Sequence, residues 1–213
     1  MAFCDCSNTI HIVNVWLLHV VKNTIAKHVA FFRKESLMTS EKLLIKDRVC
    51  GSCSVCCVSL RINTPGLKKK ADIPCANIRP QGGCAIYNER PPVCRTWHCG
   101  WRMLPIMDSS LRPDRSNILI RFNGEEWFFQ AADNLHISSI LTNEMLKVIA
   151  AMIMNNGKVT ISIPTRSGFC NALVELNAPL KDAIESRSLV KVKSILQSLI
   201  IQNSKSITKP ITA

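Results

Sequence analysis

The stretch CGSCSVCC, residues 50–57, places four cysteines within eight positions and sets the character of the chain. Four more cysteines follow before residue 100, so the complete pattern reads C-x2-C-x2-C-C, then x17-C, x8-C, x9-C and x4-C. These eight of the eleven cysteines are Cys50, Cys53, Cys56, Cys57, Cys75, Cys84, Cys94 and Cys99. Their clustering predicts that all eight are metal ligands.

A C-x2-C pair suits a metal because a short turn directs two sulfur atoms at one ion. Cys50, Cys53 and Cys56 form two overlapping pairs of this kind, whereas the adjacent Cys57 directs its sulfur elsewhere. The arrangement indicates two centres, or one polynuclear cluster with spare thiols. Eight thiols equal two complete Cys4 sites in number, but the spacing does not show which cysteines share a site.

The metal has two candidates. Zinc favours C-x2-C pairs and closed Cys4 sites. The C-x2-C-x2-C run also opens the loops of bacterial ferredoxins, which favours an iron–sulfur cluster such as 4Fe–4S. That match is partial, because the fourth position is Cys57 and not a Cys-Pro three residues later. All-thiolate ligation suits both metals, so iron–sulfur is favoured here and zinc stays open.

The cysteines and their neighbours together resemble a known family. The residues that carry the resemblance are CGSCSVCC at 50–57, Pro74-Cys75, Gly83 to Tyr87, and RPPVCRTWHC at 90–99. This order is similar to the CxxCxxCC cysteine-cluster family, also called YkgJ-like, a set of zinc- or iron-chelating proteins with eight characteristic cysteines. The resemblance covers about residues 47–101. A related cluster occurs in flagellin lysine-N-methylases, so the resemblance also permits methyl transfer.

Structural burial and disulfide bonding account less well for the cysteines. Buried reduced cysteines rarely fall in runs inside loops rich in glycine and proline, and disulfides belong to oxidising compartments. The segment before Ile10 contains Asp5 and no lysine or arginine, and no small-residue cleavage motif follows Val21, so a secretory signal is not indicated. We expect a cytoplasmic protein with reduced thiols and no transmembrane segment, because the apolar stretch 10–21 is too short to cross a bilayer.

The fold class expected from the sequence is α+β. Hydrophobic residues make up 47% of the chain and mean hydropathy is +0.12, which excludes wholesale disorder. Five glycines and six prolines between residues 45 and 105 predict loops and short turns, which metal–thiolate bonds would hold together. We therefore predict an irregular cysteine module (about 45–105) packed on a small α+β scaffold with a hairpin and two main helices.

Three regions are predicted: an extension at 1–37, an eight-cysteine module at 38–115 and an α+β C-terminal scaffold at 116–213. In the scaffold, strands are expected at 117–122 and 126–131 around the turn formers Asn123 and Gly124. A helix is expected at 142–154, a further strand at 158–163 and a helix at 180–201. His136 and Cys170 lack recognisable chemistry and are expected to be structural.

The extension at 1–37 runs from an apolar stretch to a basic end. It is either an amphipathic helix on a membrane surface, a helix packed on the core, or not part of the natural protein. The segment that follows Met38 resembles a fresh start, so we hypothesise that translation begins there. Cys4 and Cys6 lie in this extension and are not counted among the ligands.

A formal charge of +12, from 27 basic and 15 acidic residues, permits an anionic partner such as nucleic acid. The only compact basic run is Lys68, Lys69 and Lys70, which a solvated loop explains equally well. Eight thiolate ligands with two divalent ions would lower the charge by four, to about +8. Part of the basic excess would then balance the metal centre itself.

Aromatic and basic neighbours of the cysteines are expected to support the centre. Arg90, Arg95 and Tyr87 would donate hydrogen bonds or positive charge to it; alternatively Tyr87 packs in the loop and Arg90 pairs with Glu89. His98 is an alternative ligand. The two nearby tryptophans, Trp97 and Trp101, would exclude water.

The function class expected is metal binding, with the biochemical role open. One alternative is a cluster-dependent enzyme such as a protein lysine methyltransferase. The other is a zinc-stabilised module that binds nucleic acid or protein, with no partner protein specified. The radical signature C-x3-C-x2-C, a glycine-rich nucleotide loop and a His-x-x-Glu pair are all missing from the sequence. No catalytic residue can therefore be named, and enzymatic activity stays undecided.

Overall fold

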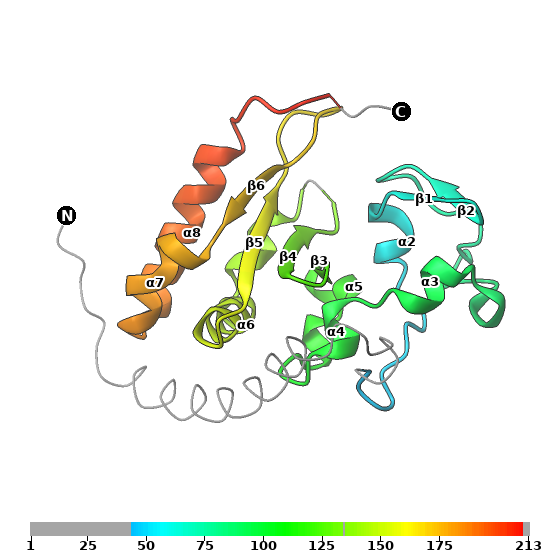
Figure 1. Cartoon of the computed structure of the whole chain (residues 1–213), viewed down its shortest axis with the longest axis horizontal. Coiled ribbons are helices and arrows are strands. Elements are labelled where there is room, and N and C mark those ends of the chain that lie inside the picture. Colours follow the sequence, from blue (N-terminus) through cyan, green and yellow to red (C-terminus); the bar gives the residue numbers. More distant parts are fainter. Residues whose placement is uncertain (1–43, 134, 211–213) are drawn as a thin grey trace.

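The computed structural model describes residues 44–133 and 135–210 (Figure 1). The predicted extension at 1–37, its cysteines Cys4 and Cys6 and the hypothetical start at Met38 lie outside these residues. Within the part described, helices and two small sheets confirm the mixed α+β class.

The larger sheet has four strands in the order β3-β4-β5-β6. Its strands are β3 (Ile118–Phe122), β4 (Glu126–Ala131), β5 (Lys158–Ile163) and β6 (Ala172–Glu175). The pairs β3–β4 and β5–β6 are antiparallel, whereas β4 and β5 run parallel. The predicted strands at 117–122, 126–131 and 158–163 are confirmed, and β6 is a strand that was not predicted.

The β3–β4 hairpin turns as its sequence indicates. The side-chain oxygen of Asn123 accepts hydrogen bonds from the main-chain N–H groups of Glu125 and Glu126. Gly124 has a φ of 104°, a left-handed conformation that glycine adopts without strain. These two features fix the register in which Phe122 faces Trp127.

Helix α6 (Asn143–Met154) connects the parallel strands β4 and β5 and confirms the helix predicted at 142–154. The single helix predicted at 180–201 is wrong, because the chain forms α7 (Asn177–Glu185) and α8 (Leu189–Asn203). Arg187 takes a left-handed φ of 55°, which ends α7. The Ser188 hydroxyl then accepts from the Lys191 N–H and caps the start of α8. The described scaffold thus has three main helices instead of two.

The core lies between the four-stranded sheet and helices α6 to α8 (Figure 1). Its side chains come from all of these elements and include Phe129, Met145, Ile149, Ile161, Leu180 and Leu196. The core gives the scaffold its own source of stability.

The cysteine-bearing segment has only short elements. These are α2 (Val55–Ser59), β1 (Ile62–Thr64), β2 (Leu67–Lys69), the 3-10 turn η2 (Tyr87–Glu89), α3 (Pro92–Thr96) and α4 (Gly100–Met103). Strands β1 and β2 form an antiparallel pair of their own. The expectation of loops and short turns is confirmed, although the β1–β2 pair was not predicted. Figure 1 shows α2, α3 and this pair gathered on the side of β3 away from β5 and β6.

Short connecting elements lie between this segment and α6. They are η3 (Ser109–Leu111), α5 (Pro113–Ser116) and η4 (Ile137–Leu141). No helix among the described residues is both long and apolar enough to cross a membrane.

The cysteine-bearing segment is fastened to the scaffold at several points. A Cβ added to Gly100 would lie 2.8 Å from the Cβ of Ile120, so α4 packs closely on β3 directly after Cys99. The Ser59 hydroxyl donates to the Ala132 carbonyl at 2.9 Å, which fixes the end of α2. The two regions are therefore in direct contact at both ends of the cysteine-bearing segment.

Arg48 joins the two ends of the cysteine pattern. Its guanidinium donates to the main-chain carbonyls of Trp101, Leu104 and Met107, and its carbon lies 5.3 Å from the centre of the Trp101 ring. Burial lowers the pKa of Arg48, and the nearby Asp108 opposes that shift. One side chain thus connects the segment before Cys50 with the loop after Cys99.

Candidate metal centre

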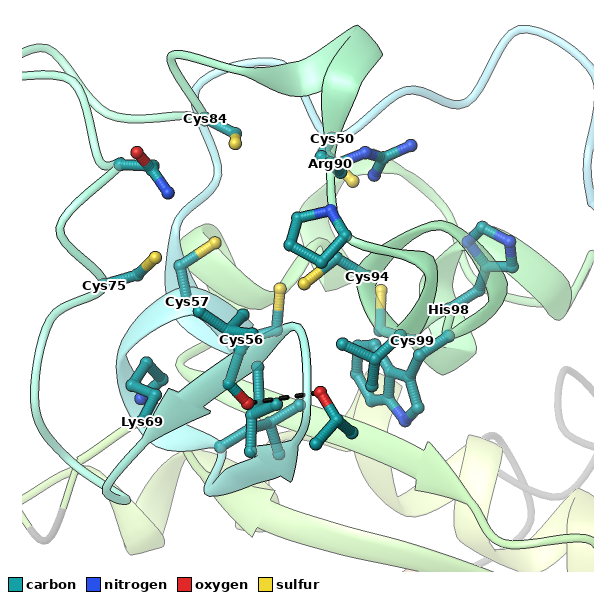
Figure 2. Close-up of a pocket in the computed structure, with 18 of the residues that line it drawn as sticks. Cys50, Cys56, Cys57, Lys69, Cys75, Cys84, Arg90, Cys94, His98 and Cys99 are labelled. Atoms are coloured by element: carbon teal, nitrogen blue, oxygen red, sulfur yellow. Dashed lines mark hydrogen bonds between the residues drawn. The ribbon is translucent and has the colours of Figure 1, made fainter.

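One cavity of about 300 Å³ is lined by all eight clustered cysteines. Figure 2 shows the labelled cysteine side chains arriving from different loops and helices, with their sulfur atoms directed into the shared space. The cysteines predicted as ligands, spread over 50 positions from 50 to 99, are thus brought together by the fold. The lining cysteines are Cys50, Cys53, Cys56, Cys57, Cys75, Cys84, Cys94 and Cys99.

The first cysteines are positioned by a turn and a helix. The Cys53 N–H donates to the Cys50 carbonyl at 3.0 Å, and Gly51 takes a left-handed φ of 56° inside this turn. Helix α2 then carries Cys56 and Cys57 at adjacent positions. Adjacent helical residues are rotated by about 100°, yet both side chains line the same cavity.

The loop that carries Cys84 lies directly on this turn. A Cβ at Gly83 would collide with the Gly51 carbonyl oxygen, and one at Gly82 would collide with that of Ser52. The Gly83 N–H donates to the Ser54 hydroxyl at 2.8 Å. Two glycines at positive φ are thus required for this loop to approach the C-x2-C turn.

The other three cysteines reach the cavity from separate segments. The Cys75 N–H donates to the Cys57 carbonyl at 3.0 Å, which holds the loop after β2 against α2. Cys94 lies in α3, where Pro92 occupies the first turn as helix geometry allows. Cys99 immediately precedes α4 and packs against the scaffold core.

The cysteines divide into two groups by their surroundings. Four of them also line a second small cavity of about 20 Å³ on the side of Trp101 and Leu119, and these are Cys50, Cys53, Cys56 and Cys99. Burial raises the pKa of Cys99, with the charge of Cys50 adding to it. Burial also raises the pKa of Cys94, where the added charges are those of Cys57, Cys75 and Cys84. The second group is therefore Cys57, Cys75, Cys84 and Cys94.

The adjacent pair in α2 connects the two groups. A hydrogen bond between the thiols lowers the pKa of Cys57, helped by the positive charges of Lys69 and Arg90. The same hydrogen bond raises the pKa of Cys56. Burial raises the pKa of Cys53 to about 11. Because only thiolates bind metal, ligation here requires protons to leave.

The donor set fits a thiophilic metal. None of the nine cysteines in the described residues forms a disulfide, so all eight lining sulfur atoms are free to bind. No aspartate or glutamate of the described residues lines the cavity, so the set lacks the hard carboxylate donors that calcium or magnesium prefer. Within residues 44–133 and 135–210, however, no three His, Cys, Asp or Glu side chains reach the mutual spacing of a completed metal site. The thiols surround a space and do not converge on one point.

Lys69 differs from its two neighbours in the basic run at 68–70. Its side chain is buried, and its ammonium donates to the carbonyls of Val58, Lys70 and Ile73 at 2.7, 2.8 and 2.8 Å. Burial lowers the pKa of Lys69, while the charges of Cys75 and Asp72 oppose that shift. The interpretation of this run as a solvated loop is therefore wrong for its central residue.

Four arginines line the same cavity, and three of them were not expected there. Arg90 was predicted; its guanidinium carbon lies 3.7 Å from the centre of the Tyr87 ring. The alternative pairing of Arg90 with Glu89 is not among the ion pairs of the described residues. Arg61, directly before β1, Arg102, in α4, and Arg121, in β3, were missed because a chain with 27 basic residues gives no local signal for them.

The remaining supporting residues take different positions. His98 is buried and lines the cavity, and Trp97 lines it as expected. Trp101 lies instead beside the smaller cavity, with its indole N–H donating to the Asp108 carbonyl at 2.9 Å. Arg95 is exposed and does not line the cavity, so the predicted support from this residue is absent.

The two residues expected to be structural lie away from these cysteines. His136 contacts Asp133, with 2.6 Å between its Nδ1 and a carboxylate oxygen. Cys170 is exposed, and its main-chain N–H donates to the Lys209 carbonyl at 2.9 Å. Neither residue lines the cavity.

Comparisons with protein-family models, with curated proteins and with solved structures found no match to this chain.

Proposed function

We propose that this is a metal-binding protein that coordinates an iron–sulfur cluster or zinc through its eight clustered cysteines. The observation that carries the proposal is that all eight line one cavity, to whose wall the described residues contribute no carboxylate. Membership of the CxxCxxCC cysteine-cluster family and a cytoplasmic location, where thiols stay reduced, are parts of the same proposal.

The two groups of cysteines support two centres. The first group would bind through Cys50, Cys53, Cys56 and the remote Cys99, which is the C-x2-C-x2-C run completed by a fourth thiolate. Such a set of four thiolates is what a 4Fe–4S cluster requires. The second group would bind through Cys57, Cys75, Cys84 and Cys94, and four thiolates of this kind also complete a zinc site.

Metal and sulfide analysis of the anaerobically purified full chain, with its absorption spectrum, tests the proposal. Iron with acid-labile sulfide and absorption near 400 nm would identify an iron–sulfur protein, and zinc alone would identify a Cys4 site. Cys170→Ser is the matched control, because this thiol is exposed and lies outside the cavity. A wild-type chain without metal, or equal metal loss in Cys170→Ser and Cys53→Ser, would contradict the proposal.

The division into two centres has its own test. Cys56→Ser is expected to remove only the metal of the first centre, and Cys57→Ser only that of the second, so each variant should keep the metal of the other centre. The two substitutions are chemically identical and lie at adjacent positions of α2. Loss of all metal in both variants would indicate one polynuclear cluster instead.

A cluster-dependent enzyme is a second candidate, and the apolar side chains beside the cysteines favour it. Leu60, Ile62 and Val93 line the cavity and cannot bind a metal, but they could border a substrate. Protein lysine methylation is one reaction in this class. A change in the metal spectrum on adding a small ligand such as cyanide would support an open coordination position, and an unresponsive spectrum would favour a structural site.

A nucleic-acid-binding module is less well supported. The central lysine of the only compact basic run is buried and already bonded to three carbonyls. Its charge is therefore not presented to a phosphate backbone.

A further inference from the structure

The wall of the cysteine cavity holds hydrogen-bond donors that nothing in the described protein satisfies. The Nε atoms of Arg90, Arg102 and Arg121 are buried and have no hydrogen-bond acceptor within residues 44–133 and 135–210. All three side chains line the cavity. Buried guanidinium donors normally have partners, so three unsatisfied groups around one space indicate a missing acceptor.

Arg102 is the clearest of the three. It is 8% exposed, and its Nη1 donates to the Tyr87 hydroxyl at the long distance of 3.4 Å. Arg121 stacks on the ring of Phe128, whose centre lies 5.1 Å from its guanidinium carbon. Neither arginine belongs to an ion pair among the described residues. A guanidinium offers five N–H donors in a rigid fork, so both side chains keep donors available for a ligand.

The thiolates of a metal centre compensate the charge of these arginines and can accept some of their N–H groups. The Nε donors have no acceptor among the described residues, and a fork with several N–H groups can serve a thiolate and a further ligand together. The acceptor that fits a guanidinium fork is planar and carries two oxygens, which is the geometry of a carboxylate.

The wall also carries a set of apolar side chains. Side chains from the segments around α2, β1 and α3 line the same space, among them Leu60, Ile62, Val93 and Trp97. A free inorganic anion would leave this surface without a partner, whereas an organic anion would cover it. The combination of unsatisfied guanidinium forks and an apolar wall defines an amphipathic ligand.

We propose that the cavity binds a small organic carboxylate with an apolar body, its carboxylate held by Arg102 and Arg121 beside the metal centre. This inference rests on the proposed metal-binding function, because the ligand shares the cavity with the thiols. It assigns the substrate or effector class of the site as a monocarboxylate small enough for part of about 300 Å³.

Calorimetric titration of the full, metal-loaded chain with hexanoate tests this proposal, with hexanamide as the uncharged probe of the same shape. Hexanoate is expected to bind saturably with one site per chain, and hexanamide at least tenfold more weakly. Arg102→Gln and Arg121→Gln should each weaken hexanoate binding at least tenfold, with metal content unchanged. Arg79→Gln is the matched control, since Arg79 is exposed in the same module and does not line the cavity.

The outcomes separate this inference from the proposed function. Metal content, measured before any ligand is added, decides the proposed function by itself. Equal binding of hexanoate and hexanamide, no saturable binding by metal-loaded wild type, or preferential binding of inorganic phosphate would each overturn the carboxylate site. Loss of metal in both Arg102→Gln and Arg121→Gln would also overturn it, because the arginines would then serve the metal centre.

Discussion

Replacing Lys69 with methionine tests whether a buried cation holds the cysteine segment together. Lys69 is 9% exposed, and its ammonium donates to the carbonyls of Val58, Lys70 and Ile73. Val58 lies in α2 beside Cys57, and Ile73 lies in the loop that leads to Cys75. Methionine has a similar length and no donor, so Lys69→Met leaves all three carbonyls without this partner.

The expected loss follows from two opposing contributions. A hydrogen bond to a charged group contributes about 1.5–3 kcal/mol, so three of them amount to roughly 4–9 kcal/mol. Burying an ammonium costs several kcal/mol, and methionine avoids that cost. The difference predicts that Lys69→Met lowers the free energy of unfolding by about 2–4 kcal/mol.

Urea unfolding of the metal-loaded chain, followed by tryptophan fluorescence, measures this effect. With a slope of about 2 kcal/mol per molar urea, the midpoint should fall by roughly 1–2 M. Lys68→Met is the matched control, because Lys68 is the exposed neighbour on β2, and it should change stability by less than about 0.5 kcal/mol. Wild-type stability in Lys69→Met, or equal losses in the two variants, would refute the reasoning.

Three further outcomes are expected. Gly83→Ala should destabilise the chain by about 1–3 kcal/mol in thermal unfolding, because Gly83 has a φ of 79° and the new Cβ would collide with the Gly51 carbonyl. Gly66→Ala is the control and should leave the stability unchanged, because the space around Gly66 is open. Arg48→Lys should cost about 1–3 kcal/mol in urea unfolding, because an ammonium does not reproduce a fork that serves three carbonyls; an unchanged midpoint would contradict this. Hydrogen bonds from Ser110 hold the pKa of Asp108 below its ordinary 3.8. The contribution of the Asp108 carboxylate to the free energy of unfolding is therefore present above pH 3.8 and is lost as pH falls through the lowered pKa. The stability gap between wild type and Asp108→Asn at neutral pH should therefore shrink in acid, and a gap that widens would be the wrong sign.

The scaffold was predictable where local chemistry determined its conformation. Asn123 and Gly124 form the turn that their types indicate, and the apolar pattern at 142–154 gives α6. The prediction failed at 180–201 because the apolar period continues across the break. The break depends on Arg187 in a left-handed conformation and on Ser188 as a cap, which periodicity does not detect. Strands of three residues, such as β1 and β2, are too short to show alternation.

The candidate site was predictable only in part, for a related reason. Eight cysteines in 50 positions stand out because the residue is rare and its spacing has chemical meaning. Their division into two groups depends on which loops lie together, and no spacing encodes that. Lys69, Arg102 and Arg121 are single members of a set of 27 basic residues, and what distinguishes them is their place in the cavity wall. That place is set by contacts between distant segments, such as that between Arg102 and Tyr87.

The location of these cations changes what the net charge of +12 means. A buried thiolate is stabilised by a nearby positive charge and destabilised by a negative one. Lys69 and Arg90 accordingly lower the pKa of Cys57, and the described residues give the cavity wall basic groups but no carboxylate. Those charges face the thiols and are not spread over an outer surface where a phosphate backbone would meet them. These cations of the cavity wall therefore support the formation of metal-binding thiolates and are not placed to bind a nucleic acid.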